Sequence, residues 1–153
     1  MFDREKSVAY AYKWAFSFNP EYYNFSELGG DCTNFVSQCV NVGGISMNYL
    51  PDGWYYVNLN RRAPAWTGVN EFWDFGVKND GVGLKIRGCG VLELQVGDVA
   101  QLYNGVKFYH TLIITEVGNG VPDVKVAAHD NPAFNKPVLS YGANSIRFGK
   151  VFD

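Results

Sequence analysis

The segment from Gly29 to Gly44 constrains the fold most, because two glycine pairs bracket a short run with helical spacing. Apolar residues recur there at i, i+1, i+4 and i+5, which predicts a helix from about Thr33 to Val42. Gly43 can end this helix in a left-handed conformation. The buried stripe consists of Phe35, Val36, Cys39 and Val40, and the other side carries Asn34, Ser37, Gln38 and Asn41.

This arrangement places Cys32 at the helix N-terminus. Free backbone N–H groups and the helix dipole favour an anion there, so a thiolate is stabilised over a thiol. The alternative is a small buried cysteine that packs under a helix cap. Cys32 is therefore a candidate nucleophile. Asp31 is expected to cap the helix, or else to hold a charge near the site.

Composition sets the class of protein. A chain of 153 residues is expected to form one domain, residues 1–153, and its 47% apolar and 18% charged content excludes disorder. A net charge of −2 leaves no basic footprint, which argues against a nucleic-acid partner. No apolar run is long enough to span a membrane, and no signal peptide is recognisable. We expect a monomer. If the domain is part of a longer secreted chain, we expect it outside the cell or in the cell envelope, and otherwise in the cytoplasm.

The three cysteines do not predict a disulfide or a metal site. On one helix, Cys32 and Cys39 would lie about 10 Å apart, whereas a disulfide needs Cα atoms within roughly 7 Å. A zinc site built from these cysteines and a histidine lacks the usual short ligand spacing. No metal and no organic cofactor is expected.

The predicted elements follow the order of an α+β fold: helices first, then an antiparallel meander. Asp3 caps a first helix from about Arg4 to Phe16, the helix from Thr33 is the second, and a third follows Thr67. The buried stripe of the first helix is expected at Val8, Ala11, Tyr12, Ala15 and Phe18. Predicted strands are Trp54–Leu59, Val99–Leu102, His110–Val117, Val124–His129 and Ser145–Val151.

Four large rings are candidate substrate contacts: Tyr22, Tyr23, Trp54 and Trp66. They either complete the core or line a groove for an extended ligand, and we expect the groove. Tyr22 or Tyr23 could also stabilise an oxyanion, together with the backbone N–H of Cys32.

Both histidines of the chain fall at one end of the predicted hairpin. His110 opens one strand and His129 closes the next, so their side chains would lie roughly 5 Å apart. Asp130 and Asn131 stand just beyond. Thiol catalysis needs a nucleophile, a base and a group that orients the base. We therefore predict Cys32 as nucleophile and His110 as base. The third residue is predicted as His129 or Asp130.

Several motifs carry a family resemblance. Asp31-Cys32-Thr33-Asn34-Phe35-Val36-Ser37-Gln38 resembles the nucleophile segment of NlpC-type cell-wall cysteine peptidases, and more closely that of the bacterial "putative amidase domain" family, a relative of the NlpC and CHAP groups. Leu94-Gln95-Val96-Gly97-Asp98-Val99 is similar to the entry to the central strands, with Asp98 expected as a turn residue. Tyr109 to Thr115 resembles the catalytic-histidine strand, and Ala127 to Asp130 the strand end that carries the third residue.

The resemblance implies a papain-like fold in which a helix bearing the cysteine packs against an antiparallel sheet bearing the histidine. It implies Cys32 as nucleophile and His110 as base. The third position maps to His129, and a slipped register would promote Asp130 or Asn131. The implied partner is a peptide or a peptidoglycan fragment whose amide bond is hydrolysed.

Two other functions use the same residues. An acyltransferase or transpeptidase would pass the acyl group from the thiol to an amine instead of water. A non-catalytic module would bind cell-wall or protein ligands through the aromatic groove.

Overall fold

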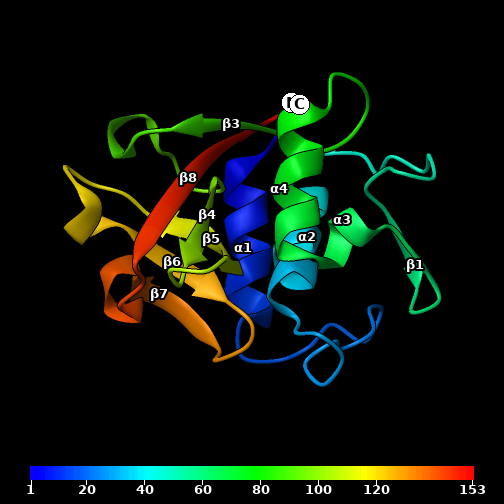
Figure 1. The fold of residues 1–153 in the computed structure, drawn as a ribbon, viewed down its shortest axis with the longest axis horizontal. Coiled ribbons are helices and arrows are strands. Elements are labelled where there is room, and N and C mark those ends of the chain that lie inside the picture. Colours follow the sequence, from blue (N-terminus) through cyan, green and yellow to red (C-terminus); the bar gives the residue numbers. More distant parts are fainter.

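The computed structural model describes all residues 1–153 and shows an α+β architecture with four α-helices and an antiparallel sheet (Figure 1). The helices are α1 (Arg4–Trp14), α2 (Cys32–Val42), α3 (Pro64–Thr67) and α4 (Val69–Lys78). The main sheet contains β3 (Lys85–Cys89), β4 (Val99–Tyr103), β5 (Phe108–Glu116), β6 (Lys125–Ala128), β7 (Ala133–Pro137) and β8 (Ser145–Phe152). A hairpin of β1 (Tyr56–Asn58) and β2 (Arg61–Arg62) and three 3₁₀ turns, η1 (Val91–Glu93), η2 (Val121–Asp123) and η3 (Val138–Tyr141), complete the chain.

The six strands lie in the order β3-β8-β4-β5-β6-β7, and every neighbouring pair is antiparallel. The last strand, β8, therefore lies between β3 and β4 rather than at an edge, so the sheet is not the simple meander that the sequence predicted (Figure 1). The predicted strands near Val99, His110, Val124 and Ser145 are confirmed, while β3 and β7 were missed. Both missed strands form the edges of the sheet, where exposed and turn-forming residues weaken the apolar pattern.

Helix α1 begins as predicted, with the Asp3 carboxylate accepting a hydrogen bond from the backbone N–H of Lys6 at 3.0 Å. Its buried face differs from the prediction. Tyr12 is 72% exposed, and the face that packs inward carries the small residues Ser7, Ala11 and Ala15. These small side chains let the backbones of α1 and α2 approach closely, which a tyrosine on that face would prevent.

Helix α2 is the central element, and its bounds match the prediction. It is buried on every side from Cys32 to Val40, because α1, α3, α4 and strands β5 and β6 all pack around it. Its polar side faces tryptophans: Trp66 Nε1 donates to Asn34 Oδ1 at 2.9 Å and Trp54 Nε1 donates to Ser37 Oγ at 3.1 Å. The helix end also differs, since Gly43 is right-handed and it is Gly44, with φ +109°, that takes the left-handed region.

The sheet has two different faces. The α-helices cover one face, where Phe35 and Val36 of α2 share a core with Ile113 of β5. Leu112 and Ile114 belong to a second core on the opposite face. This second core also contains Leu102, Val126 and Val138. Between the register shifts of β5, from His110 to Ile114, alternation thus assigns odd-numbered residues to the helix face and even-numbered residues to the other face.

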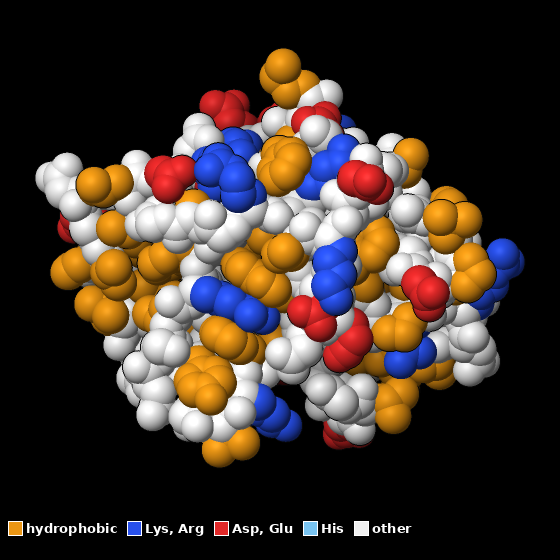
Figure 2. All heavy atoms as spheres, turned by 45° about the horizontal axis from the view of Figure 1, so that its top comes forward, with side chains coloured by type: hydrophobic (Ala, Val, Ile, Leu, Met, Phe, Trp, Pro, Cys, Tyr) orange, Lys and Arg blue, Asp and Glu red, His pale blue; other side chains and the backbone are white.

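The surface in Figure 2 mixes charges of both signs. Lysine and arginine side chains lie among aspartate and glutamate side chains on this face, with apolar groups between them. No helix reaches the length and apolarity that crossing a bilayer requires.

Candidate active site

Cys32 is the first residue of α2, and its side chain is 6% exposed. Its Sγ lies 3.7 Å from Thr33 Oγ1. Burial raises the pKa of this thiol, and hydrogen bonds from the Thr111 backbone and from Thr33 oppose the rise only in part. The thiol is therefore protonated at neutral pH, and a base is needed to form the nucleophile.

The N-terminus of α2 already holds a carboxylate. Asp130 accepts hydrogen bonds from the backbone N–H of Asp31 at 2.8 and 3.0 Å and from that of Cys32 at 3.0 Å. The approach requires Gly30, since a Cβ at that position would lie 2.8 Å from Asp130 Oδ2 and its φ is +99°. The N–H of Cys32, predicted as an oxyanion donor, is thus engaged by Asp130.

His110 lies on β5 and is 6% exposed. Its ring packs edge-on against Tyr141 of η3, with centroids 5.6 Å apart, and its Nε2 is buried without a hydrogen-bond partner. Burial lowers the pKa of His110 to about 4, an effect that the charge of Asp130 opposes and that of Lys136 reinforces. A neutral imidazole at pH 7 is the form that can accept a proton.

The direction of the His110 ring follows from its strand. His110 pairs with Leu102 of β4, and paired residues share a face, so its Cβ lies on the face opposite α2. Thr111 points the other way and bonds Thr33 of α2 through Oγ1 at 2.9 Å. No hydrogen bond joins Cys32 Sγ to His110. The thiol is instead beside the backbone of the next residue, Thr111, and the charge of Asp130 acts on the pKa of both Cys32 and His110.

His129 follows the end of β6 and has partners of its own. Its Nδ1 lies 2.5 Å from Asp31 Oδ2 and its Nε2 lies 2.8 Å from the carbonyl oxygen of Trp14. Both partners are acceptors, so both contacts are hydrogen bonds when the ring is an imidazolium that donates from each nitrogen. Neither nitrogen is left to orient His110. The ring also stacks on Phe35 at 4.0 Å, which fixes it against α2.

Asp31 is almost completely buried and does not cap α2. Besides His129, it accepts hydrogen bonds from the backbone N–H of Phe25 at 2.8 Å and from Asn34 Nδ2 at 2.9 Å. The expectation of a cap is wrong, because Asp130 from a distant turn takes that role. Asp31 instead ties the loop before α2, the helix and the end of β6 into one rigid corner.

The predicted aromatic groove does not exist as an exposed surface. Trp54 and Trp66 are completely buried, with ring centroids 4.7 Å apart, so the expectation that they contact substrate is wrong. Tyr22 is half-buried and stacks on Trp66. Only Tyr23, at 42% exposed, presents its ring to solvent. Trp54 and Trp66 lie in the core because side chains of α2 accept hydrogen bonds from their indole N–H groups.

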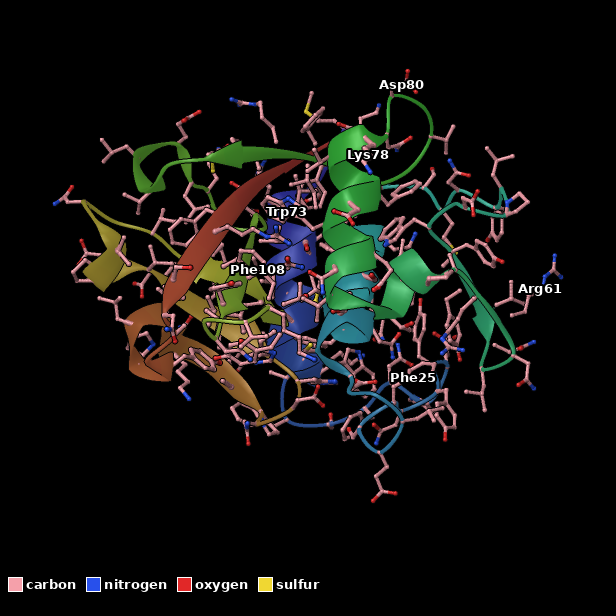
Figure 3. The ribbon with its side chains drawn as sticks, in the orientation of Figure 1. Phe25, Arg61, Trp73, Lys78, Asp80 and Phe108 are labelled. Atoms are coloured by element: carbon pink, nitrogen blue, oxygen red, sulfur yellow. The ribbon has the colours of Figure 1, made fainter.

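One cleft lies away from the thiol. It has a volume of about 630 Å³ and runs between α4 and the loop that precedes β1, lined by residues such as Asp52, Glu71, Lys78 and Asp80. Figure 3 shows Lys78 and Asp80 at the opposite end of the helical layer from Phe25, whose backbone bonds Asp31 beside Cys32. No three His, Cys, Asp or Glu side chains converge as a metal site would require.

Sequence reasoning missed the polar groups that support α2 from within. Thr33, Thr111 and Gln101 are completely buried and hydrogen-bonded to one another in a row. One signal was available: Gln101 and Thr111 stand beside apolar residues in their predicted strands, and a buried polar residue needs a partner.

Comparison with known proteins places the chain among amidase-like sequences. Residues 1–151 match the family described as "Putative amidase domain". A relative from Bacillus subtilis (strain 168), described as "Uncharacterized protein YhbB", is 33% identical over 137 residues. That match covers 85% of this chain but only 42% of the relative, so the chain spans less than half of that protein's length. No solved structure matches the chain.

Proposed function

Since the chain belongs to the family described as "Putative amidase domain", we propose that it is a papain-like cysteine hydrolase that cleaves amide bonds through Cys32. The observation that carries the proposal is the site at the N-terminus of α2. Cys32 lies there beside the strand that bears His110, and the charge of Asp130 acts on the pKa of both residues.

The proposed reaction uses a neutral thiol and a neutral imidazole. His110 removes the proton from Cys32 Sγ as the sulfur attacks the amide carbonyl, and the resulting imidazolium returns the proton to the leaving amine. A thioester remains on Cys32. A water molecule, deprotonated by His110, then attacks the thioester, releasing the carboxylic acid and restoring the thiol. Because the Cβ of His110 lies on the sheet face opposite α2 and no hydrogen bond joins the pair, the proposed reaction requires the His110 ring to leave Tyr141 and turn toward the thiol when substrate binds.

Asp130 is the proposed third residue. Its charge raises the pKa of His110, so it stabilises the imidazolium that forms after proton transfer. His129, with both ring nitrogens engaged, instead holds Asp31 and α2 in place. The substrate class is an amide in a peptide or peptidoglycan fragment, which rests on the resemblance of the nucleophile segment to cell-wall cysteine peptidases. Tyr23 is an exposed ring near this corner that such a substrate can contact.

The test combines turnover with detection of the covalent intermediate. The wild-type chain is incubated with a panel of muropeptides and peptides, products are followed by mass spectrometry, and the thioester on Cys32 is sought by intact mass after acid quench. We expect Cys32→Ala and His110→Gln to abolish turnover. Cys39→Ala, which removes a buried thiol two turns along the same helix, is the matched control and should remain active. Unchanged turnover in Cys32→Ala would refute the proposal.

One observation favours transfer to an amine as a second function. The thiol is 6% exposed, so a thioester formed on it would be shielded from water and could wait for an amine acceptor. Adding glycinamide or a stem peptide with a free amino group would then divert product from the acid to a new amide. If only the acid forms at every amine concentration, transfer is excluded and hydrolysis stands.

A further inference from the structure

A row of polar side chains runs across the helix-covered face of the sheet to the thiol. It starts at Arg147 on β8, passes through Gln101 on β4 and Thr111 on β5, and reaches Thr33 on α2, beside Cys32. The three middle residues, Gln101, Thr111 and Thr33, are all completely buried. Buried hydroxyl and amide groups are costly unless each finds a partner, and here each partner is the next member of the row.

The direction of the first bonds is fixed by Arg147. Its Nε and Nη2 donate to Gln101 Oε1 at 3.0 and 2.5 Å. A guanidinium can only donate, so the oxygen of the amide must face it and the nitrogen must face the other way. Gln101 Nε2 then donates to the carbonyl oxygen of Val69 at 2.8 Å and to Thr111 Oγ1 at 3.1 Å.

Counting hydrogens fixes the remaining bonds. Thr111 Oγ1 accepts from Gln101, and the other partner of this hydroxyl is Thr33 Oγ1 at 2.9 Å, so its own hydrogen points to Thr33. Thr33 then has its hydrogen free, and Cys32 Sγ at 3.7 Å is the acceptor in reach. One N–H of Gln101 is directed to the carbonyl oxygen of Val69, and the other donors of the row point toward the sulfur.

The outer end of the row carries a positive charge that is held firmly. The guanidinium of Arg147 lies 4.1 Å from the ring centroid of Trp73 and 3.6 Å from that of Phe108. Figure 3 shows these two rings close together, one from α4 and the other from β5. Cation–π contact with two rings keeps the charge in place although the side chain is partly buried.

We propose that Arg147, Gln101, Thr111 and Thr33 form a polarised hydrogen-bond chain that holds a donor on Cys32 Sγ and stabilises its thiolate. The inference rests on the proposed function only in taking Cys32 as the reactive thiol. These four are positioning residues: Thr33 is the one whose side chain contacts the sulfur, and the contact of Thr111 with the sulfur is through its backbone. The charged and titratable groups that face the same corner are Asp130 at the helix N-terminus, the Asp31–His129 pair below α2 and His110 on β5. The charge of Asp130 raises the pKa of Cys32 and so disfavours the thiolate, and the hydrogen-bond chain offsets this effect.

The test is the pH dependence of alkylation of Cys32 by iodoacetamide, with the modified peptide quantified by mass spectrometry so that Cys39 and Cys89 are counted separately. Thr33→Val removes the last donor and keeps the shape. We expect the apparent pKa of Cys32 to rise by about one unit, which slows alkylation about tenfold at pH values below that pKa. Thr33→Ser should restore the wild-type profile.

A second variant separates the chain from a merely local effect of Thr33. Thr111→Val leaves Thr33 in place but removes its supporting donor, so we expect a shift in the same direction of about threefold in rate. Ser37→Ala is the matched control, because Ser37 is a buried hydroxyl on the same helix whose bonds go to Trp54 and Trp66. If the threonine variants do not fold, the same alkylation assay is applied to Arg147→Met, which changes the outer end of the row.

The outcomes are distinguishable from those of the proposed function. An unchanged alkylation profile in folded Thr33→Val, or a shift of equal size in Ser37→Ala, overturns the hydrogen-bond chain even if Cys32 is required for turnover. If the pKa of Cys32 shifts in Thr33→Val and Thr111→Val but the wild-type protein cleaves no amide, the result supports the hydrogen-bond chain and counts against the proposed amidase function.

Discussion

Two buried polar clusters differ in how completely their groups are paired. Around Asp98, the carboxylate receives Arg4 Nη1 at 2.6 Å, Lys150 Nζ at 3.0 Å and two backbone N–H groups, so nothing is left unsatisfied. Around Cys32, the side-chain partner of the sulfur is a hydroxyl 3.7 Å away, a second partner is the Thr111 backbone, and the Nε2 of His110 is buried with no partner. The saturated cluster joins α1 to β8 and serves stability. The unsaturated one leaves unpaired the imidazole that the proposed reaction uses.

The largest expected effect comes from removing the thiol of the unsaturated cluster. Cys32→Ala should lower amide turnover by at least about 10⁴-fold, because no other group can form the thioester. The free energy of unfolding should change by no more than about 1 kcal/mol, since the removed sulfur is small. Steady-state rates and urea denaturation of the same preparations measure both. A variant that loses stability in proportion to activity would mean that Cys32 is a core residue.

The next effect breaks the saturated cluster. Asp98→Ala should lower the free energy of unfolding by about 3–5 kcal/mol, because it leaves the charges of Arg4 and Lys150 without their buried partner. Urea denaturation gives the value. At a temperature where this variant is still folded, alkylation of Cys32 should proceed at the wild-type rate. Slower alkylation in the folded variant would show that the two clusters are coupled.

The same contrast explains what the sequence could predict. The glycine pairs and apolar spacing predicted α2 and the place of Cys32 at its start, because both follow from local backbone rules. The sequence expected Asp98 as a turn residue, and nothing local shows that Arg4 and Lys150, from the two ends of the chain, meet there.

The candidate site shows the same limit. Local rules predicted that Asp31 caps α2, yet the cap comes from Asp130, 98 residues further along from Cys32. The alternation of side chains along a strand places Thr111 and His110 on opposite faces of β5, and the sequence contains that information. It does not contain which of the two faces α2 covers. The buried state of Trp54 and Trp66 likewise depends on partners in α2 that pair with them only after folding.

A smaller effect concerns pH and the unpaired imidazole. The folded-state pKa of His110 is about 4, against about 6.5 when unfolded, so between these values the unfolded chain binds the extra proton. Stability from this group is complete above pH 6.5 and is lost as pH falls toward 4. His110→Gln should therefore lose about 2 kcal/mol less unfolding free energy than the wild type between pH 7 and pH 5. Parallel urea curves at the two pH values test this, and equal losses in both proteins would contradict it.

The smallest expected effect concerns Asp130, whose carboxylate binds the N-terminus of α2. The charge of Asp130 raises the pKa of the Cys32 thiol and raises that of His110. Asp130→Asn keeps an oxygen that can accept from the helix N–H groups but removes the charge, so alkylation of Cys32 below its pKa should become about two- to threefold faster. Amide turnover should fall at the same time, because the imidazolium of His110 loses its stabilising carboxylate. Opposite signs in the two assays from one substitution are what a catalytic carboxylate requires, whereas a purely structural cap predicts that both rates change together or not at all.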